Sequence, residues 1–122
     1  MQRFAMDDLL QWKERASRKP LVIMGARQVG KTWLMKEFGK KYYEKTAYIS
    51  FYNNRRMKDV FDVDFDIERI IMNLNIESGV TITPGNTLII LDEIQNVPKV
   101  LESLKYFCEE APEYHVVAAG SL

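Results

Sequence analysis

The feature that most limits the fold of this chain is a glycine-bordered segment directly behind an apolar run. Residues 25–32 read Gly-Ala-Arg-Gln-Val-Gly-Lys-Thr, matching the phosphate-binding pattern G-x-x-x-x-G-K-[ST], and Leu-Val-Ile-Met precedes them at 21–24. This order predicts a buried strand, a tight loop and a helix that begins near Lys31. The backbone N–H groups of the loop and the helix N-terminus would attract a phosphate chain. The pattern therefore predicts that the chain binds a nucleoside triphosphate.

A second apolar run ends in two acidic residues. Residues 87–91 read Thr-Leu-Ile-Ile-Leu and are followed by Asp92 and Glu93. Such runs are typical of parallel strands covered by helices on both faces, and ligands bind beyond the carboxyl ends of these strands. We expect Asp92 to face Mg²⁺ through a water, and Glu93 to orient or deprotonate the water that attacks the γ-phosphate. The alternative is a solvated acidic turn, which the complete phosphate loop disfavours.

The rest of the chain alternates between helical and extended patterns. Helices are predicted at 6–17, 31–42, 67–78 and 98–111, and strands at 21–25, 48–51, 87–91 and 114–119. The segment that follows the second strand is rich in Asn, Arg and Asp, and we expect it to be irregular. Asp66 is expected to cap the third helix and Gly79 to end it. The alternation predicts a single α/β domain with a parallel sheet and right-handed crossovers.

Four motifs together resemble a prokaryotic family of AAA-type ATPases over nearly the whole chain. They are Gly-Ala-Arg-Gln-Val-Gly-Lys-Thr at 25–32, Asp-Glu-Ile-Gln at 92–95, Ser-Leu-Lys-Tyr-Phe at 103–107 and His-Val-Val-Ala-Ala-Gly-Ser-Leu at 115–122. The resemblance implies a three-layer P-loop NTPase core with a parallel sheet of order 5-1-4-3-2. Four of these five strands are recognised here, which gives the predicted order 1-4-3-2.

The resemblance also implies a function and a set of site residues. It implies an ATP-binding module with Mg²⁺-dependent hydrolysis in the full-length protein, and ATP and Mg²⁺ as its cofactors. The residues implied to bind the phosphates are Gly25, Ala26, Arg27, Gln28, Val29, Gly30, Lys31 and Thr32. The implied metal contacts are Thr32 and Asp92, and the implied catalytic residues are Glu93, Lys31 and Ser121, the last of which senses the γ-phosphate.

Members of that family are usually longer, with a helical lid and further domains. We therefore expect residues 1–122 to be the N-terminal part of a single ATPase domain, with weak ATP binding and slow hydrolysis. The expected reason is that this part does not include the lid or the arginine finger, and an arginine finger contributes several orders of magnitude in rate. Without a fifth strand, the strand at 21–24 is expected to be an uncovered apolar edge. Such an edge favours pairing with a second copy of the chain.

Two other functions use the same loop. A nucleotide-dependent switch would bind ATP with negligible turnover. A phosphotransferase would pass the phosphate to an acceptor, but the pair Asp92-Glu93 favours activation of water instead.

Composition and charge narrow the remaining classes. A chain of 122 residues with 47% hydrophobic content suffices for one core, and the single Cys108 excludes an internal disulfide. No apolar stretch reaches membrane-spanning length and no secretory signal is recognised, so we expect a cytoplasmic protein.

The net charge is zero, but residues 1–61 hold fourteen Lys or Arg against six Asp or Glu, and residues 62–122 hold three against eleven. A nucleic-acid surface and solvated helix faces are both consistent with this bias, and the second is the more common. The basic residues concerned are Lys13, Arg15, Arg18, Lys19, Lys36, Lys40 and Lys41.

Three single residues have ordinary structural interpretations. Trp33 follows Thr32 and could approach a base or ribose, but we expect it to pack against the protein. His115 is the only histidine, with no Cys or second His to complete a metal site, and is expected to begin a strand; Cys108 is expected to be inert.

Overall fold

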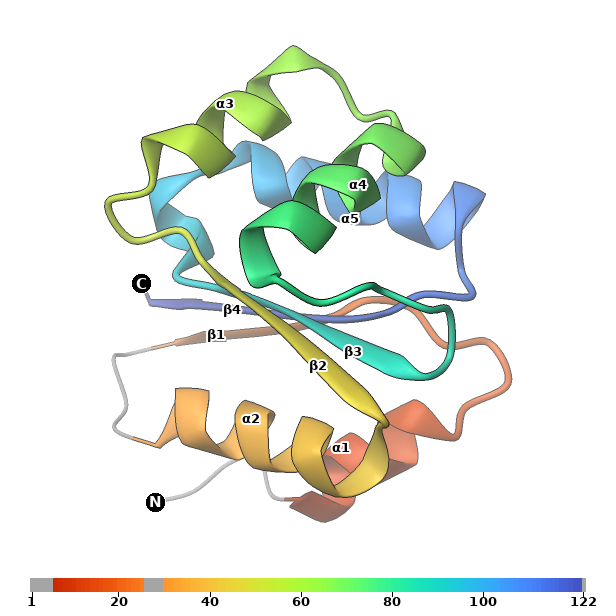
Figure 1. Cartoon of the computed structure of the whole chain (residues 1–122). Helices are drawn as coiled ribbons and strands as arrows, with labels where there is room; N and C mark the ends of the chain where they lie inside the picture. The colour runs from red at the N-terminus through yellow and green to blue at the C-terminus, as the bar shows by residue number, and fades with distance from the viewer. Residues whose placement is uncertain (1–5, 26–29, 122) are drawn as a thin grey trace.

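The chain folds into a parallel sheet between two layers of helices. A computed structural model describes residues 6–25 and 30–121. One face of the sheet carries α1 (Met6–Lys13) and α2 (Lys31–Tyr42), and the other carries α3 (Arg55–Val63), α4 (Ile67–Ser78) and α5 (Lys99–Glu110), as Figure 1 shows. The strands are β1 (Leu21–Gly25), β2 (Lys45–Ser50), β3 (Thr87–Asp92) and β4 (His115–Ser121), and a short 3₁₀ helix, η1 (Ile94–Asn96), follows β3.

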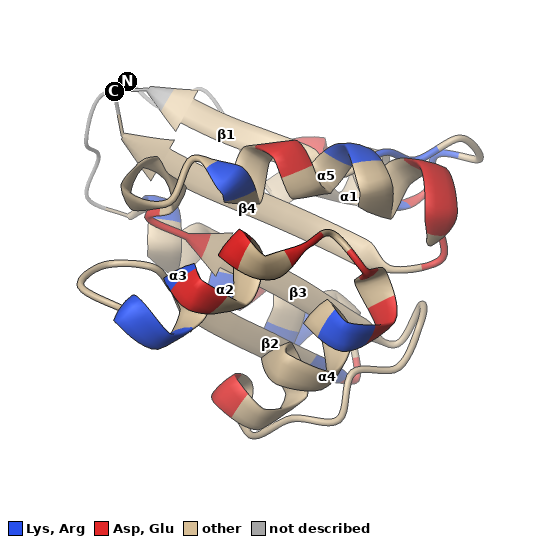
Figure 2. Ribbon diagram, turned by 90° about the horizontal axis from the view of Figure 1, so that it is seen from above, with Lys and Arg blue, Asp and Glu red and all other residues tan. Residues whose placement is uncertain are grey.

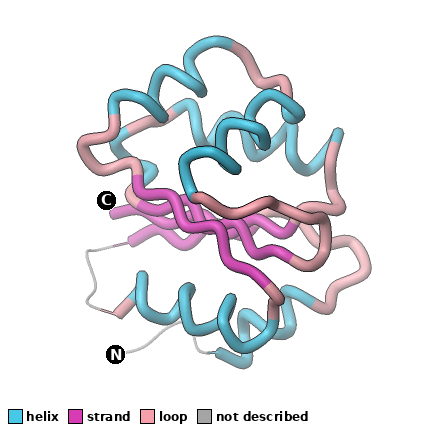
Figure 3. The backbone as a smooth tube through the Cα atoms, in the orientation of Figure 1, coloured by secondary structure: helices cyan, strands magenta, loops and turns pink. Residues whose placement is uncertain are grey.

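The strand order confirms the predicted topology. The described strands form one all-parallel sheet in the order β1-β4-β3-β2. The chain leaves β1 through α2 on one face and reaches the far edge at β2. It then returns through α3, α4 and α5 on the opposite face (Figure 3). The path first crosses the sheet in one direction and then returns in the other, and the connecting helices change face at the same point, so all crossovers keep the same right-handed sense. The carboxyl ends of all four strands therefore meet at one edge of the sheet.

The continuous apolar run of β3 is explained by the helices on both faces. All six residues of β3 are buried. Leu88 and Ile90 pack with the side chains of α1 and α2, whereas Ile89 and Leu91 pack with those of α3, α4 and α5. A strand covered on both sides needs apolar residues at every position, which removes the usual alternation. The sheet is thus a rigid platform for the residues that follow its strands.

The expectation of an irregular segment after the second strand was wrong, because α3 forms there. Asn54 caps this helix, and its side chain accepts a hydrogen bond from the Met57 backbone nitrogen at 3.2 Å. Met57, Val60 and Phe61 are buried at helical spacing. The apolar spacing and the cap outweigh the polar composition of the segment.

Several predicted boundaries also shift. The first helix ends at Lys13 rather than residue 17, because the Arg18 guanidinium donates to the Lys13 carbonyl at 2.9 Å and the chain turns back. The second strand begins at Lys45, three residues earlier than predicted. Asp66 and Gly79 flank α4 as predicted, but the Asp66 side chain makes no capping hydrogen bond.

Candidate functional site

The helix α2 begins directly beyond the edge at which the strands end. Gly30 precedes it with φ 104° and ψ −13°, and its carbonyl accepts a hydrogen bond from the Leu34 nitrogen at 2.8 Å. A side chain at Gly30 would meet no atom within 4 Å, so the positive φ rather than crowding requires glycine. The predicted phosphate contacts Ala26, Arg27, Gln28 and Val29 lie outside the described residues. Gly30 and the first turn of α2 nevertheless set the position of the two residues that follow, Lys31 and Thr32.

The carboxylate of Asp92 lies next to the hydroxyl of Thr32. One oxygen, Oδ2, accepts hydrogen bonds from Thr32 Oγ1 at 2.6 Å and from the Tyr48 hydroxyl at 2.8 Å. The other, Oδ1, accepts from the Glu93 backbone nitrogen at 2.9 Å. Asp92 is only 3% exposed. The structure therefore brings together two predicted metal contacts that are sixty residues apart in sequence.

Tyr48 is a site residue that the sequence analysis missed. Burial, and secondly its hydrogen bond to the Asp92 carboxylate, raises the pKa of the Tyr48 hydroxyl well above its ordinary value. It therefore stays a hydrogen-bond donor at neutral pH. The Lys36 ammonium lies 4.0 Å from the centre of the Tyr48 ring. The only sequence signal was a tyrosine in a strand whose end pairs with Asp92.

The ammonium of Lys31 reaches the end of β4. Its Nζ donates to the Gly120 carbonyl at 2.7 Å. Gly120 directly precedes Ser121, which pairs with Gly25 of β1 in the register of the sheet. The predicted catalytic residues Lys31 and Ser121 are thus near each other at the same edge.

Glu93 follows Asp92 in an unusual backbone conformation. Its φ of 59° and ψ of 42° are left-handed, and among the described residues only Asn53 shares a positive φ without being glycine. Its carboxylate Oε1 accepts a hydrogen bond from Gln95 Nε2 at 2.8 Å, and Gln95 Oε1 accepts one from the Ser121 nitrogen at 3.0 Å. Gln95 is a second residue that the sequence analysis did not assign to the site.

Lysine, hydroxyl and paired carboxylates at the end of parallel strands agree with the comparison to known families. The family model described as AAA domain matches residues 17–122. The chain belongs to the AAA domain family. This membership makes it an ATPase-like nucleotide-binding module. No curated protein sequence gives a significant match.

The residues of this AAA domain fit a magnesium ion bound together with a nucleotide. Thr32 Oγ1 and Asp92 Oδ2 are hard oxygen donors only 2.6 Å apart. Mg²⁺ is usually held by one or two carboxylates, with phosphates and waters as its other ligands. Within residues 6–25 and 30–121, no group of three or more His, Cys, Asp or Glu could hold an ion by itself. The donor set therefore suits a metal that arrives with phosphate.

Two tryptophans of the AAA domain have opposite environments. Trp33, in the first turn of α2, is 62% exposed, so the expectation that it packs against the protein was wrong. Trp12 on α1 is 4% exposed, and its Nε1 donates to the Lys19 carbonyl at 2.6 Å. The face of α2 that carries Trp33 points away from the sheet, because Met35 and Phe38 occupy the buried face.

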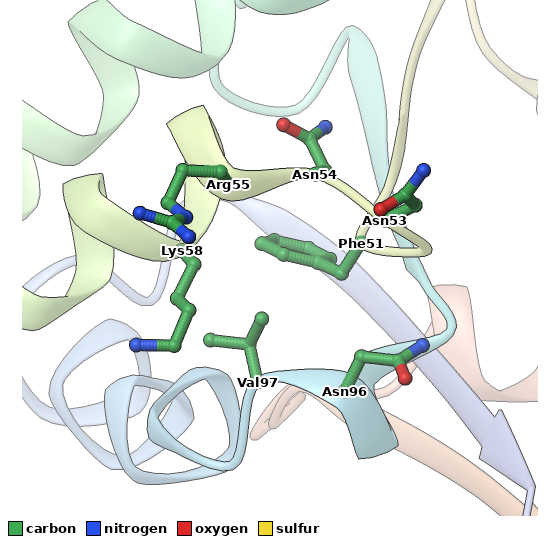
Figure 4. Close-up of a pocket in the computed structure, with 7 residues that line it drawn as sticks. All are labelled: Phe51, Asn53, Asn54, Arg55, Lys58, Asn96 and Val97. Atoms are coloured by element: carbon green, nitrogen blue, oxygen red, sulfur yellow. The ribbon is translucent and has the colours of Figure 1, made fainter.

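A separate cleft of about 250 Å³ opens beyond the ends of β2 and β3 (Figure 4). Its lining consists of Phe51, Asn53, Asn54, Arg55, Lys58, Asn96 and Val97. None of the predicted site residues lines it. Lys58 already pairs with Asp62 at 2.8 Å. The cleft therefore lies at the same edge of the sheet as the predicted site residues but is lined by other side chains.

The basic half of the chain, residues 1–61, and the acidic half, residues 62–122, contribute different strands to the sheet. The outer strands β1 and β2 come from the basic half, and the inner strands β3 and β4 come from the acidic half. On the face that carries α3 and α5, both helices bear basic as well as acidic side chains (Figure 2). Among the described helices of the AAA domain, none is long and apolar enough to span a bilayer.

Proposed function

We propose that this AAA domain binds ATP with Mg²⁺ and hydrolyses it. The observation that carries the proposal is the contact of the Thr32 hydroxyl with the buried Asp92 carboxylate, directly at the start of the helix that follows the glycine loop. The residues assigned to the phosphates are Gly25, Ala26, Arg27, Gln28, Val29, Gly30, Lys31 and Thr32. Bound Mg²⁺ would neutralise charge on the phosphate oxygens.

Each charged side chain has one task in this proposal. Lys31 exchanges the neutral Gly120 carbonyl for phosphate oxygens, because the ammonium is attracted more strongly to an anionic acceptor than to a neutral one. Thr32 and Asp92 hold the metal. Glu93 orients the attacking water and accepts its proton, and Ser121 contacts the γ-phosphate.

Calorimetric titration of ATP and GTP, each with and without Mg²⁺, tests the proposal. We expect Mg²⁺-dependent binding that Lys31→Ala abolishes and Glu93→Gln preserves, with turnover lost in the second variant. Lys40→Ala is the matched control, because Lys40 lies exposed in the last turn of the same helix. Binding of ATP by the Lys31 variant at the parent's affinity would contradict the assignment.

A nucleotide-dependent switch is the second candidate, and one contact favours it. Glu93 Oε1 accepts a hydrogen bond from Gln95, and if that contact held the carboxylate away from the attacking water, ATP would bind without turnover. A switch would bind ATP while releasing almost no phosphate in the steady state, whereas hydrolysis gives continuous release. A phosphotransferase would release little free phosphate, and it would form ADP rapidly only after an acceptor is added that takes up the γ-phosphoryl group.

The edge strand β1 supports a proposal about self-association in the cytoplasm. Among the described strands β1 pairs only with β4, and Met24 on it is 37% exposed. A second copy could extend the sheet along this edge. Light scattering should then show a mass that grows with concentration, and a constant monomer mass would exclude this contact.

A further inference from the structure

A continuous chain of contacts joins the start of α2 to Glu93 through the end of β4. Lys31 Nζ donates to the Gly120 carbonyl at 2.7 Å. The next residue, Ser121, donates its backbone N–H to Gln95 Oε1 at 3.0 Å. Gln95 Nε2 in turn donates to Glu93 Oε1 at 2.8 Å. One side-chain amide therefore connects the acidic tip of β3 to the strand that Lys31 contacts.

We propose that Gln95 is a positioning residue that orients the Glu93 carboxylate and ties it to the end of β4. The inference rests on the proposed function, since Glu93 is the residue assigned to the attacking water. Gln95 itself would touch neither the nucleotide nor the water. It acts through Glu93, and its position depends on Ser121.

The packing around Gln95 leaves its amide little freedom. A Cβ atom at Gly120 would lie 2.9 Å from Gln95 Oε1 and 3.0 Å from the Met24 sulfur, so the amide rests against the bare backbone of β4. On the other side, η1 is closed by the Val97 nitrogen, which donates to the Ile94 carbonyl at 3.0 Å, and Ile94 is fully buried. The backbone that carries Gln95 is therefore fixed on both sides.

The chemistry of an amide matches both contacts. It offers one acceptor and one donor, and the Ser121 N–H needs the first while the Glu93 carboxylate needs the second. A glutamate of the same shape has no donor and would repel Glu93. Within residues 6–25 and 30–121, no hydrogen bond to the other carboxylate oxygen of Glu93 is found, so this oxygen can accept one from water. The hydrogen bond from Gln95 thus orients the Glu93 carboxylate while it occupies only one of the two carboxylate oxygens.

The same amide compensates for the backbone of Glu93. A left-handed conformation is unfavourable for a non-glycine residue, and such residues persist where the surroundings hold them. The Glu93 nitrogen bonds Asp92 Oδ1 at 2.9 Å, and its side chain bonds Gln95. Asp92 therefore holds the backbone of Glu93, and Gln95 holds its side chain.

The first test needs no nucleotide. Amide hydrogen exchange of Ser121 is measured by NMR in the parent and in Gln95→Ala. Loss of the acceptor should raise the exchange rate at Ser121 at least about tenfold, the effect of losing roughly 1.4 kcal/mol of protection. Asn96→Ala is the control, because Asn96 lies on the same 3₁₀ turn and its side chain bonds the Glu93 carbonyl instead. Equal Ser121 exchange in the parent and Gln95→Ala would overturn the inference.

The second test separates turnover from binding. Gln95→Ala should lower kcat about tenfold or more, because a small misplacement of a catalytic group costs up to about 100-fold, while ATP affinity stays within about twofold. Gln95→Glu keeps the volume and loses the donor, so it should be impaired at least as much. A Gln95→Glu variant with the parent's kcat would show that only volume matters. A faster Gln95→Ala variant would equally contradict a positioning role.

The two proposals fail in different ways. A parent that neither binds ATP nor releases phosphate would remove the proposed function, and with it the role of Gln95 in turnover. An active parent whose Gln95 variants keep its kcat would remove the inference about Gln95 alone.

Discussion

The sheet carries a buried polar pair at each end, and only one of them belongs to the proposed site. At the amino end of β4, His115 is 6% exposed, and its Nδ1 lies 2.6 Å from the Tyr43 hydroxyl. At the carboxyl end of β3, Asp92 is 3% exposed and bonds the Thr32 and Tyr48 hydroxyls. By burial and hydrogen bonding alone the two pairs look alike.

Their surroundings separate them. His115 is enclosed by aromatic rings, with Trp12 and Tyr43 both edge-on at 6.0 Å and 5.3 Å between ring centres. Asp92 adjoins a helix N-terminus and a second acidic residue, Glu93. A buried polar pair is therefore no sign of a site by itself. A site also requires further donors and acceptors beside the pair that a ligand can use.

The largest expected effect comes from removing the charge of Asp92. Asp92→Asn keeps the shape but loses the anionic metal ligand, so Mg²⁺-dependent turnover should fall at least about 100-fold, equivalent to about 2.7 kcal/mol. Phosphate release at saturating ATP is the measurement. Tyr43→Phe, at the other end of the sheet, is the control and should keep the parent's turnover. Equal losses of turnover in Asp92→Asn and Tyr43→Phe would show that the Asp92 end of the sheet is no more important for function than the His115 end.

The Tyr43 hydroxyl should matter for stability instead. Tyr43→Phe leaves buried His115 Nδ1 without its partner, and an unsatisfied buried polar group costs about 1–3 kcal/mol. Urea unfolding measures the loss. Tyr42→Phe is the matched control, since Tyr42 is 39% exposed. A Tyr43 variant as stable as the parent but weaker in ATP binding would assign the His115 pair to function.

A smaller effect should appear in the pH dependence of unfolding. Burial, assisted by the charges of Arg18 and Lys13, lowers the pKa of His115 from 6.5 to about 4. Between these values the unfolded chain binds more protons, so the free energy of unfolding should fall as pH drops from 6.5 to 4 and level off below. The lowered pKa limits the loss from this group to at most about 3 kcal/mol.

Urea titrations over that pH range give the comparison. His115→Asn removes the titrating group, so the difference in stability between parent and variant should change with pH. A difference that stays constant would show that His115 titrates alike in both states.

Much of this fold could be predicted because its signals are local. The runs at 21–24 and 87–91 mark buried parallel strands, and the glycine pattern fixes where α2 begins. Four side chains named from the motifs, Lys31, Thr32, Asp92 and Glu93, lie at one edge of the sheet because β1, which precedes α2, and β3 run in the same direction and end there.

What could not be predicted depends on contacts between distant segments. Tyr48 reaches Asp92 across forty-four positions, and Gln95 reaches Ser121 across twenty-six. Neither contact produces a recognisable motif or periodicity in the sequence. Trp33 was assigned to the interior by its residue type, although the buried face of α2 was already filled by Met35 and Phe38. For α3, the helical spacing of Met57, Val60 and Phe61 is present in the sequence, but the prediction considered only the polar composition of the segment.

The smallest effect uses the two tryptophans to report the two ends of the sheet separately. Trp33 follows Thr32 and is 62% exposed, whereas Trp12 is buried beside His115. Addition of ATP with Mg²⁺ should alter the emission of Trp33 and leave that of Trp12 unchanged. Trp12→Phe should therefore keep the response and Trp33→Phe should lose it.

Trp33→Phe should change the free energy of unfolding by no more than about 0.5 kcal/mol, as expected for an exposed position. A response that survives in Trp33→Phe but disappears in Trp12→Phe would place the nucleotide-linked change at the His115 end instead.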